Sequence, residues 1–408
     1  MKNKRKLSIW KKIVFFLIPL FVFLLLLELS ARYLCHKRFA KYHTSISVQG
    51  NSRWDRDSLT VWKNREGYLE NDNSSQYNEY GMRVKSGELK MPVKKKNDFW
   101  VFFFGGSAIA GMGSNQDGQW LKITGVSAHS IENSIDGQLE KILQKAMPDK
   151  NVRVFNAAIS AANITQSRLN YEKLRHLKPD WVVSMDCAND IHSLKEGEDP
   201  YKKLFDTWDN HPIYKLPYKQ CRRLMSNSAL AFLVGEYVFF KSGIIRNAKN
   251  TKQDREIFEY WLKQNAGRKA LPADIEPDTQ RAVASFMREL EKFNFALKYD
   301  EQKYLLLIQP HLSLRDPEKL KDIELAVYHY KLSTSPCIDP FMRAIHEKVL
   351  KNYADNKNIV SMDAVHYWDS WVFVDYCHFS EQANRKIASE IAAFILGGGT
   401  VNIFKNVQ

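Results

Sequence analysis

Short, continuous runs of apolar residues recur along this chain, and between them lie longer segments in which apolar residues repeat every three or four positions. The runs are typical of strands buried on both faces of a parallel sheet, and the longer segments are typical of amphipathic helices. The predicted strands are Phe99–Phe104, Val152–Asn156, Trp181–Met185, Tyr304–Ile308 and Asn358–Asp363. The predicted helices are Ile131–Met147, Thr165–Leu177, Thr279–Leu297 and Ser380–Ile395. Their alternation predicts a three-layer α/β/α sandwich with a mostly parallel sheet.

The first 31 residues form a separate pattern. Six of the first twelve residues are Lys or Arg, none is acidic, and residues 13–27 are uncharged. Continued to Ala31, the apolar segment approaches the roughly 20 residues that a helix needs to cross a bilayer. We therefore expect a basic cytoplasmic tail at 1–12 and an uncleaved membrane anchor at 13–31, with the rest of the chain on the periplasmic or extracellular side. A secretory signal peptide is the alternative, and it places the rest of the chain on the same side.

The remaining chain divides by composition. Residues 32–98 are polar and are expected to fold onto the core as a membrane-proximal segment. Residues 99–396 hold the predicted sheet and form the main domain, and 397–408 form a C-terminal tail. The long interval at about 195–300 is expected to be a mostly helical insertion covering one side of the domain, because long connections in compact domains tend to be lids or binding elements.

The chain carries a net charge of +14, and +8 remains when the six basic residues of the tail are set aside. This excess favours anionic partners, such as lipid head groups or an acidic polysaccharide, and the alternative is a well-solvated lysine-rich surface. No segment resembles a nucleic-acid-binding module, so nucleic acid is not expected as a partner. The five cysteines have neither Cys-x-x-Cys nor His-rich spacing, and no metal or other cofactor is expected.

Three segments that are far apart in the sequence supply side chains suited to acyl transfer. Ser107 follows the first predicted strand and two glycines, so it lies at the carboxyl end of a strand, where open α/β sheets bind ligands. Asp375 precedes His378 by three residues, so its carboxylate can hydrogen-bond the imidazole Nδ1–H and leave Nε2 to take a proton from a serine. Asn189 follows the third predicted strand and can aim its amide at a developing oxyanion. Alone, the serine is also typical of a helix cap and the asparagine of a turn.

Together these residues resemble the SGNH hydrolase superfamily, also called GDSL-like esterases and lipases, over roughly 98–396. Ser107 matches the block I serine, Asn189 with Asp190 matches the Asn-Asp of block III, and the Asp-x-x-His of block V is matched by Asp375 with His378. Their order along the chain is the order of the family. The resemblance implies a flavodoxin-like fold. It also implies that Ser107 is the nucleophile, that His378 is the base and that the carboxylate of Asp375 orients the base.

The resemblance also implies an oxyanion hole, formed by the backbone N–H groups of Ser107 and Ala161 and by the side chain of Asn189. The family has glycine in block II where this chain has Ala161. Gly106 stands in place of the aspartate before the serine, and Cys187 in place of the glycine that opens Gly-x-Asn-Asp. None of these departures removes a catalytic group, but the methyl of an alanine disfavours a positive φ.

A second Asp-x-x-His, formed by Asp363 and His366, competes for the role of base. Asp363 ends a predicted strand, and the family commonly ends its last strand in an aspartate before the loop with the catalytic pair. We therefore prefer Asp375 and His378. His366 is then expected to pack against the two aromatic residues that follow it.

Three further features carry expectations. His311, which follows the fourth predicted strand, is expected to be packed or solvated, with contact to substrate as the alternative. Cys187 and Cys377 each lie within two residues of a site residue and are hypothesised to approach and pair in an oxidising compartment, with simple packing as the alternative. The segment Asn78–Arg83 resembles the Asn-x-x-Gly-Phe-Arg element found upstream of block I in membrane-anchored SGNH proteins.

The sequence therefore predicts a membrane-anchored serine esterase of the SGNH type. By resemblance, its substrate is an acyl or O-acetyl ester on a cell-envelope or extracellular carbohydrate. Two alternatives stay open. One is an O-acyltransferase that uses the same serine, histidine and aspartate, and the other is a non-catalytic glycan-binding or assembly component, which the three departures would explain.

Overall fold

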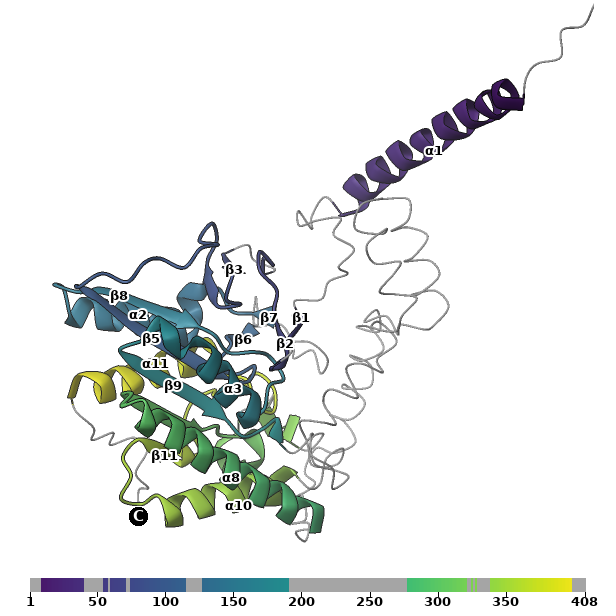
Figure 1. The fold of residues 1–408 in the computed structure, drawn as a ribbon. Helices are drawn as coiled ribbons and strands as arrows, with labels where there is room; N and C mark the ends of the chain where they lie inside the picture. Colours follow the sequence, from purple (N-terminus) through teal and green to yellow (C-terminus); the bar gives the residue numbers. More distant parts are fainter. Residues whose placement is uncertain are drawn as a thin grey trace, which may run out of the picture. The chain divides into compact units, whose positions relative to one another are not determined.

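Figure 1 shows the computed structural model of the chain, which describes residues 9–39, 54–57, 59–70, 74–114, 127–190, 277–320, 324–325, 327–328 and 338–397. The chain forms two compact units, one made of residues 1–52 and 207–248 and the other of residues 53–206 and 249–408. In the first unit the described element is helix α1 (Ile9–Phe39), and all other elements belong to the second. The predicted insertion up to residue 276 and the tail beyond Gly397 lie outside the described residues.

Helix α1 is 31 residues long and includes the apolar segment for which we expected a membrane anchor. The segment is thus helical, as predicted. Among the helices that the structure describes, none is both long enough and apolar enough to cross a membrane.

The second unit is built around a seven-stranded sheet in the order β11-β10-β9-β5-β8-β4-β3. Its strands are β3 (Ser75–Tyr77), β4 (Arg83–Lys85), β5 (Asp98–Gly105), β8 (Asn151–Asn156), β9 (Trp181–Asp186), β10 (Tyr304–Ile308) and β11 (Ile359–Ser361). The five strands from β11 to β8 run parallel to one another. β4 pairs antiparallel with β8, and β3 pairs antiparallel with β4. When the parallel strands are numbered along the chain, their order across the sheet is 2-1-3-4-5, which is the flavodoxin-like order. The predicted mixed α/β fold with a mostly parallel sheet is confirmed.

Helices cover both faces of this sheet (Figure 1). Helices α2 (Ile135–Ala146) and α11 (Glu381–Gly397) pack on one face, and α3 (Ile164–Leu174), α8 (Pro277–Tyr299) and α10 (Ile338–Asn352) pack on the other. Turns of 3-10 helix lie at Ile131–Asn133, Arg175–Leu177, Leu312–Leu314, Pro317–Lys319 and Asp363–Tyr367. The remaining strands form two small antiparallel pairs, β1 (Trp54–Asp57) with β2 (Val61–Asn64), and β6 (Met112–Ser114) with β7 (Ser127–Ala128).

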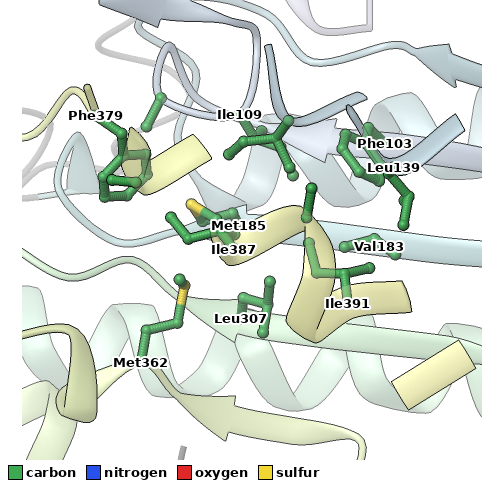
Figure 2. Packing of buried hydrophobic residues seen from close by; sticks show 14 of the residues in the cluster. Phe103, Ile109, Leu139, Val183, Met185, Leu307, Met362, Phe379, Ile387 and Ile391 are labelled. Carbon is green, nitrogen blue, oxygen red and sulfur yellow. The ribbon is translucent and has the colours of Figure 1, made fainter. Parts of the chain in front are cut away.

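The alternation of side chains along β5 explains why one strand serves two cores. Phe103 packs toward α2 and α11, whereas Phe102 and Phe104 pack toward the opposite helices, because successive strand residues point to opposite faces. Figure 2 shows the first core, where Phe103 lies near Leu139 of α2 and Ile391 of α11. The apolar face predicted for the last helix is therefore the face that it buries.

The polar segment before the main domain adds strands to the sheet. β4 pairs with β8, and β3 pairs with β4. Asn78 builds the turn between β3 and β4, because its Oδ1 accepts hydrogen bonds from the backbone N–H groups of Tyr80 and Met82 at 3.0 and 3.1 Å. Gly81 in this turn has a φ of +74°, which glycine adopts without strain. Within the described part of this segment, β3 and β4 thus extend the sheet of the main domain.

Candidate active site

Two glycines place Ser107 just beyond the carboxyl end of β5. Gly105 has a φ of +134°, and a Cβ there would lie 2.3 Å from the carbonyl oxygen of Met185 on β9. A Cβ at Gly106 would lie 2.6 Å from Nδ2 of Asn189. The glycine before Ser107 is therefore required by the position of the Asn189 amide, which lies directly against the peptide that leads into the serine. An aspartate in its place would displace that amide.

The structure brings Ser107, His378 and Asp375 together. Oγ of Ser107 lies 2.7 Å from Nε2 of His378, and Nδ1 of His378 lies 2.6 Å from Oδ2 of Asp375. Oδ1 of Asp375 accepts hydrogen bonds from the backbone N–H groups of Cys377 and His378, both at 2.8 Å. Asp375 and His378 are buried and Ser107 is half-buried. The carboxylate is thus fixed by three hydrogen bonds, and the serine faces the solvent side of the imidazole.

Burial and charge act in opposite directions on this pair. Burial lowers the pKa of His378, but the carboxylate of Asp375 together with Cys377 more than offsets burial and holds that pKa well above its usual value. Burial raises the pKa of Asp375, but His378 and the two backbone N–H groups outweigh it, and the net pKa is lowered. Each partner therefore stabilises the charged form of the other, so an imidazolium formed during proton transfer is stabilised.

Asn189 and Asp190 follow β9, and their side chains form hydrogen bonds to the backbone at the start of α3. Nδ2 of Asn189 donates a hydrogen bond to the carbonyl of Ala162 at 2.9 Å, and Oδ1 of Asp190 accepts one from the N–H of Ile164 at 3.2 Å. An amide nitrogen carries two hydrogens, so the second N–H of Asn189 is available to a ligand. Burial raises the pKa of Asp190 well above its usual value, with a further contribution from Asp186, which disfavours a negative charge beside this amide.

Both residues that replace a family glycine keep a backbone conformation suited to glycine. Ala161 has a φ of +64° and Cys187 has a φ of +147°. A non-glycine residue in such a conformation costs roughly 1–3 kcal/mol and persists only where the surroundings fix it. The surrounding structure thus holds both residues at a positive φ, which glycine adopts more readily.

Replacing Ala161 by glycine is expected to raise the melting temperature by a few degrees, about 2–4 °C per kcal/mol for a domain of this size, and to retain any ester hydrolysis. The methyl group is exposed and φ is positive, so the substitution removes strain without leaving a cavity. Thermal unfolding of both proteins measures the effect. Ala162→Gly is the matched control, because Ala162 is buried with an ordinary φ, and it is expected to destabilise. A lower melting temperature for Ala161→Gly would contradict the inference that the backbone of Ala161 is strained.

The second Asp-x-x-His pair lies elsewhere in the fold. Nδ1 of His366 lies 3.1 Å from Oδ1 of Asp363, and its Nε2 accepts a hydrogen bond from the backbone N–H of His311 at 3.1 Å. The ring of His366 packs against His346 at 5.4 Å, not against the aromatic residues that follow it, which corrects that expectation. His311 is fully buried beside Tyr376, so the packed alternative holds and direct contact with substrate does not.

The two cysteines near the site are free thiols, so the hypothesis that they pair is wrong for this structure. Sγ of Cys187 points to Sδ of Met342 at 3.5 Å, whereas Sγ of Cys377 lies 3.7 Å from Nδ1 of His378. The two thiols thus contact different partners. Among the described residues, Asp375, Cys377 and His378 form the one group of side chains close enough to share a metal ion. Two of these three are already hydrogen-bonded to each other.

Several residues that support the catalytic loop were not predicted. Nε2 of Gln309 donates to the carbonyl of Cys377 at 3.0 Å, and Oε1 of Glu324 accepts from the N–H groups of Val372 and Phe373 at 3.1 and 2.9 Å. Gln309 directly follows β10, so the rule that picked out Asn189 could have found it. Nothing in the sequence marks Glu324, because an acidic residue in a polar stretch is usually solvated.

No protein-family model matches the chain, and no curated protein matches it. Among solved structures, the chain is similar to the acetyl xylan esterase AlAXEase, with 12% identity, a TM-score of 0.35 and coverage of 73% of this chain and 100% of that one. It is similar to the acetylxylan esterase Axe2 from Geobacillus stearothermophilus, with 13% identity, a TM-score of 0.35 and coverage of 78% and 100%. It is also similar to a lipase/acylhydrolase from Enterococcus faecalis, with 14% identity, a TM-score of 0.35 and coverage of 74% and 98%.

Proposed function

We propose that this protein is a serine esterase of the SGNH type, which cleaves an acyl or O-acetyl ester. One observation carries the proposal: three side chains from separate segments form the continuous hydrogen-bonded series Ser107, His378, Asp375, with distances of 2.7 and 2.6 Å. A nucleophile bonded to a base that a carboxylate orients is the arrangement that activates a serine. The glycine-like backbone at Ala161 and Cys187 supports an active site over a binding component that merely kept the fold.

In the first half of the proposed reaction, Oγ of Ser107 attacks the ester carbonyl while Nε2 of His378 takes its proton. The carbonyl oxygen becomes an oxyanion, which the backbone N–H groups of Ser107 and Ala161 and the second N–H of Asn189 stabilise. Each such donor can contribute about 3–4 kcal/mol in the transition state. The tetrahedral intermediate then collapses, the C–O bond to the alcohol breaks, and His378 gives its proton to the leaving alkoxide.

In the second half, a water molecule attacks the acyl-serine. His378 takes a proton from the water, a second tetrahedral intermediate forms in the same oxyanion hole, and collapse returns the proton to Oγ of Ser107. The products are the free acid and the regenerated enzyme. An acceptor hydroxyl in place of the water would give acyl transfer by the same steps.

Turnover of p-nitrophenyl acetate by the full chain, with and without a neutral oligosaccharide, tests the proposal. For an esterase, acetate and p-nitrophenol are released in equal amounts at a rate that the oligosaccharide does not change. For an acyltransferase, the oligosaccharide accelerates p-nitrophenol release and becomes acetylated. If nothing is turned over and a fluorophosphonate does not label Ser107, the non-catalytic alternative is favoured instead.

The substrate and the location are further parts of the proposal. The sequence resemblance supports an ester on a cell-envelope or extracellular carbohydrate. The basic tail followed by the apolar segment at 13–31 supports export of the catalytic unit, by an anchor or by a signal peptide. Digestion of spheroplasts with an added protease, together with the mass of the N-terminus, tests this. Protection of the chain from the protease until the spheroplasts are lysed would contradict export.

A further inference from the structure

Arg83 is a fully buried cation at the end of the Asn78–Arg83 motif. Its Nε donates to Oγ of Ser75 at 3.1 Å, its Nη2 donates to the backbone carbonyl of His129, and its Nη1 lies 3.9 Å from Oδ1 of the buried Asp136. Gly111, in the turn that follows the nucleophile, has a φ of +84°, and a Cβ there would lie 2.2 Å from Nη1 of Arg83. The guanidinium therefore fits closely against the loop that leaves Ser107, and it holds the backbone of His129.

His129 is held on three sides and is almost completely buried. Its backbone N–H donates to the carbonyl of Gly111 at 2.7 Å, and Nε2 of its ring lies 3.0 Å from the carbonyl of Phe379. Because that carbonyl is only an acceptor, Nε2 carries the hydrogen and the ring donates. Burial lowers the pKa of His129 to about 4, with smaller contributions from the charges of Arg83 and His378. The ring is thus a neutral donor in the pH range in which an esterase works.

Phe379 directly follows the base, and its carbonyl belongs to the peptide between Phe379 and Ser380, so this hydrogen bond fixes the chain one residue beyond His378. Gly113 of β6 lies on the same side: a Cβ there would lie 2.8 Å from the Phe379 carbonyl and 3.2 Å from Cβ of His378. The base is therefore held at its ring by Asp375, and the residue that follows it is held by His129. A displacement of about 1 Å in such a group can cost 10²-fold in rate.

We propose that His129 is a positioning residue for the base His378, and that the β3–β4 hairpin, through Arg83, is part of the catalytic unit and not an accessory before it. The inference rests on the proposed function, since it assumes that His378 takes the proton of Ser107. It assigns a role to the Asn78–Arg83 motif, which the reaction itself does not use.

Comparison of His129→Gln, His129→Asn and His129→Leu tests this role. The glutamine amide can take the place of Nε2 and keep the bond to Phe379, whereas the asparagine amide takes the place of Nδ1, which has no hydrogen-bond partner. We expect His129→Leu and His129→Asn to lower kcat by about 10- to 100-fold with little change in KM. The His129→Gln variant is expected to keep most of the wild-type kcat. The rate at which a fluorophosphonate labels Ser107 is expected to follow kcat.

Leu143→Ala serves as a control for lost stability, because Leu143 is fully buried in α2 and touches no site residue named here. An equal loss of kcat in Leu143→Ala at a matched melting temperature would overturn the positioning role, as would equal losses in the Gln and Leu variants. The downfield proton signal of the His378 Nδ1–H reports on the base without turnover, and we expect it to weaken in Leu and persist in Gln. An unchanged signal in Leu also contradicts the inference, whereas an unreactive wild type with the expected signals contradicts only the proposed function.

Discussion

Replacing Ser107 by alanine is expected to lower kcat/KM for an ester by about 10⁴-fold or more, with little change in stability. The substitution removes the one oxygen that lies 2.7 Å from Nε2 of His378, so no nucleophile remains for the base to activate. His378→Ala is expected to cost a similar factor, and the double variant little more, because the two residues act as a unit. Initial rates with p-nitrophenyl acetate and thermal unfolding of each variant measure these effects.

Ser389→Ala is the matched control for this experiment. Ser389 is exposed on α11 and donates to the carbonyl of Arg385 at 2.9 Å, so its loss changes neither the core nor the site. We expect it to keep the activity of the wild type. If Ser107→Ala retained more than a small fraction of the rate, a different nucleophile would have to be sought.

Replacing Asp375 by asparagine is expected to lower kcat by about 10⁴-fold and to move the acidic limb of the pH profile to lower pH. Oδ1 of Asp375 accepts two backbone N–H groups, so an asparagine has to keep its oxygen there and turn Nδ2 toward His378. The imidazole is then protonated on Nε2 and cannot accept the proton of Ser107. Rates measured from about pH 5 to about pH 9, roughly two units to either side of neutrality, check both the loss of kcat and the shift of the acidic limb.

The sign of the pH shift follows from the two opposing effects on His378. In the wild type the pKa of His378 is raised by Asp375 despite burial, so the base loses its function as the pH falls through a value above the usual one. Without the carboxylate, burial still lowers the pKa of His378 and only Cys377 still raises it, so the pKa falls relative to the wild type. Activity of the variant, although small, should therefore persist to lower pH. A limb that stays in place would mean that another group controls it.

Asp363→Asn is the matched control for Asp375→Asn. Asp363 bonds His366 across the same i, i+3 spacing at 3.1 Å, yet Nε2 of His366 faces the backbone of His311 instead of a serine. We expect Asp363→Asn to lower kcat by only a small fraction of the loss in Asp375→Asn and to leave the pH profile unchanged. A large loss here with a small one for Asp375→Asn would reverse the choice of base.

The pattern of apolar residues was sufficient to predict the layers of the fold. Continuous apolar runs such as Phe99–Phe104 and Tyr304–Ile308 became strands, because a strand covered on both faces needs apolar residues at every position. The strand ends also pointed to Ser107 and Asn189, because parallel strands bring residues at their carboxyl ends to one edge. Asp375 and His378 were found from their three-residue spacing and from the resemblance to block V.

The local sequence of the two Asp-x-x-His segments does not distinguish them, and packing brings His378, not His366, to the serine. Both Asp-x-x-His segments close the same local hydrogen bond, at 2.6 and 3.1 Å, so their sequences are equivalent at short range. The positions of Ala161 and Cys187 at positive φ, and the role of His129, also follow from packing between segments distant in the chain. Local patterns set which elements form, but contacts between distant segments depend on how those elements pack, and no short stretch of sequence contains that information.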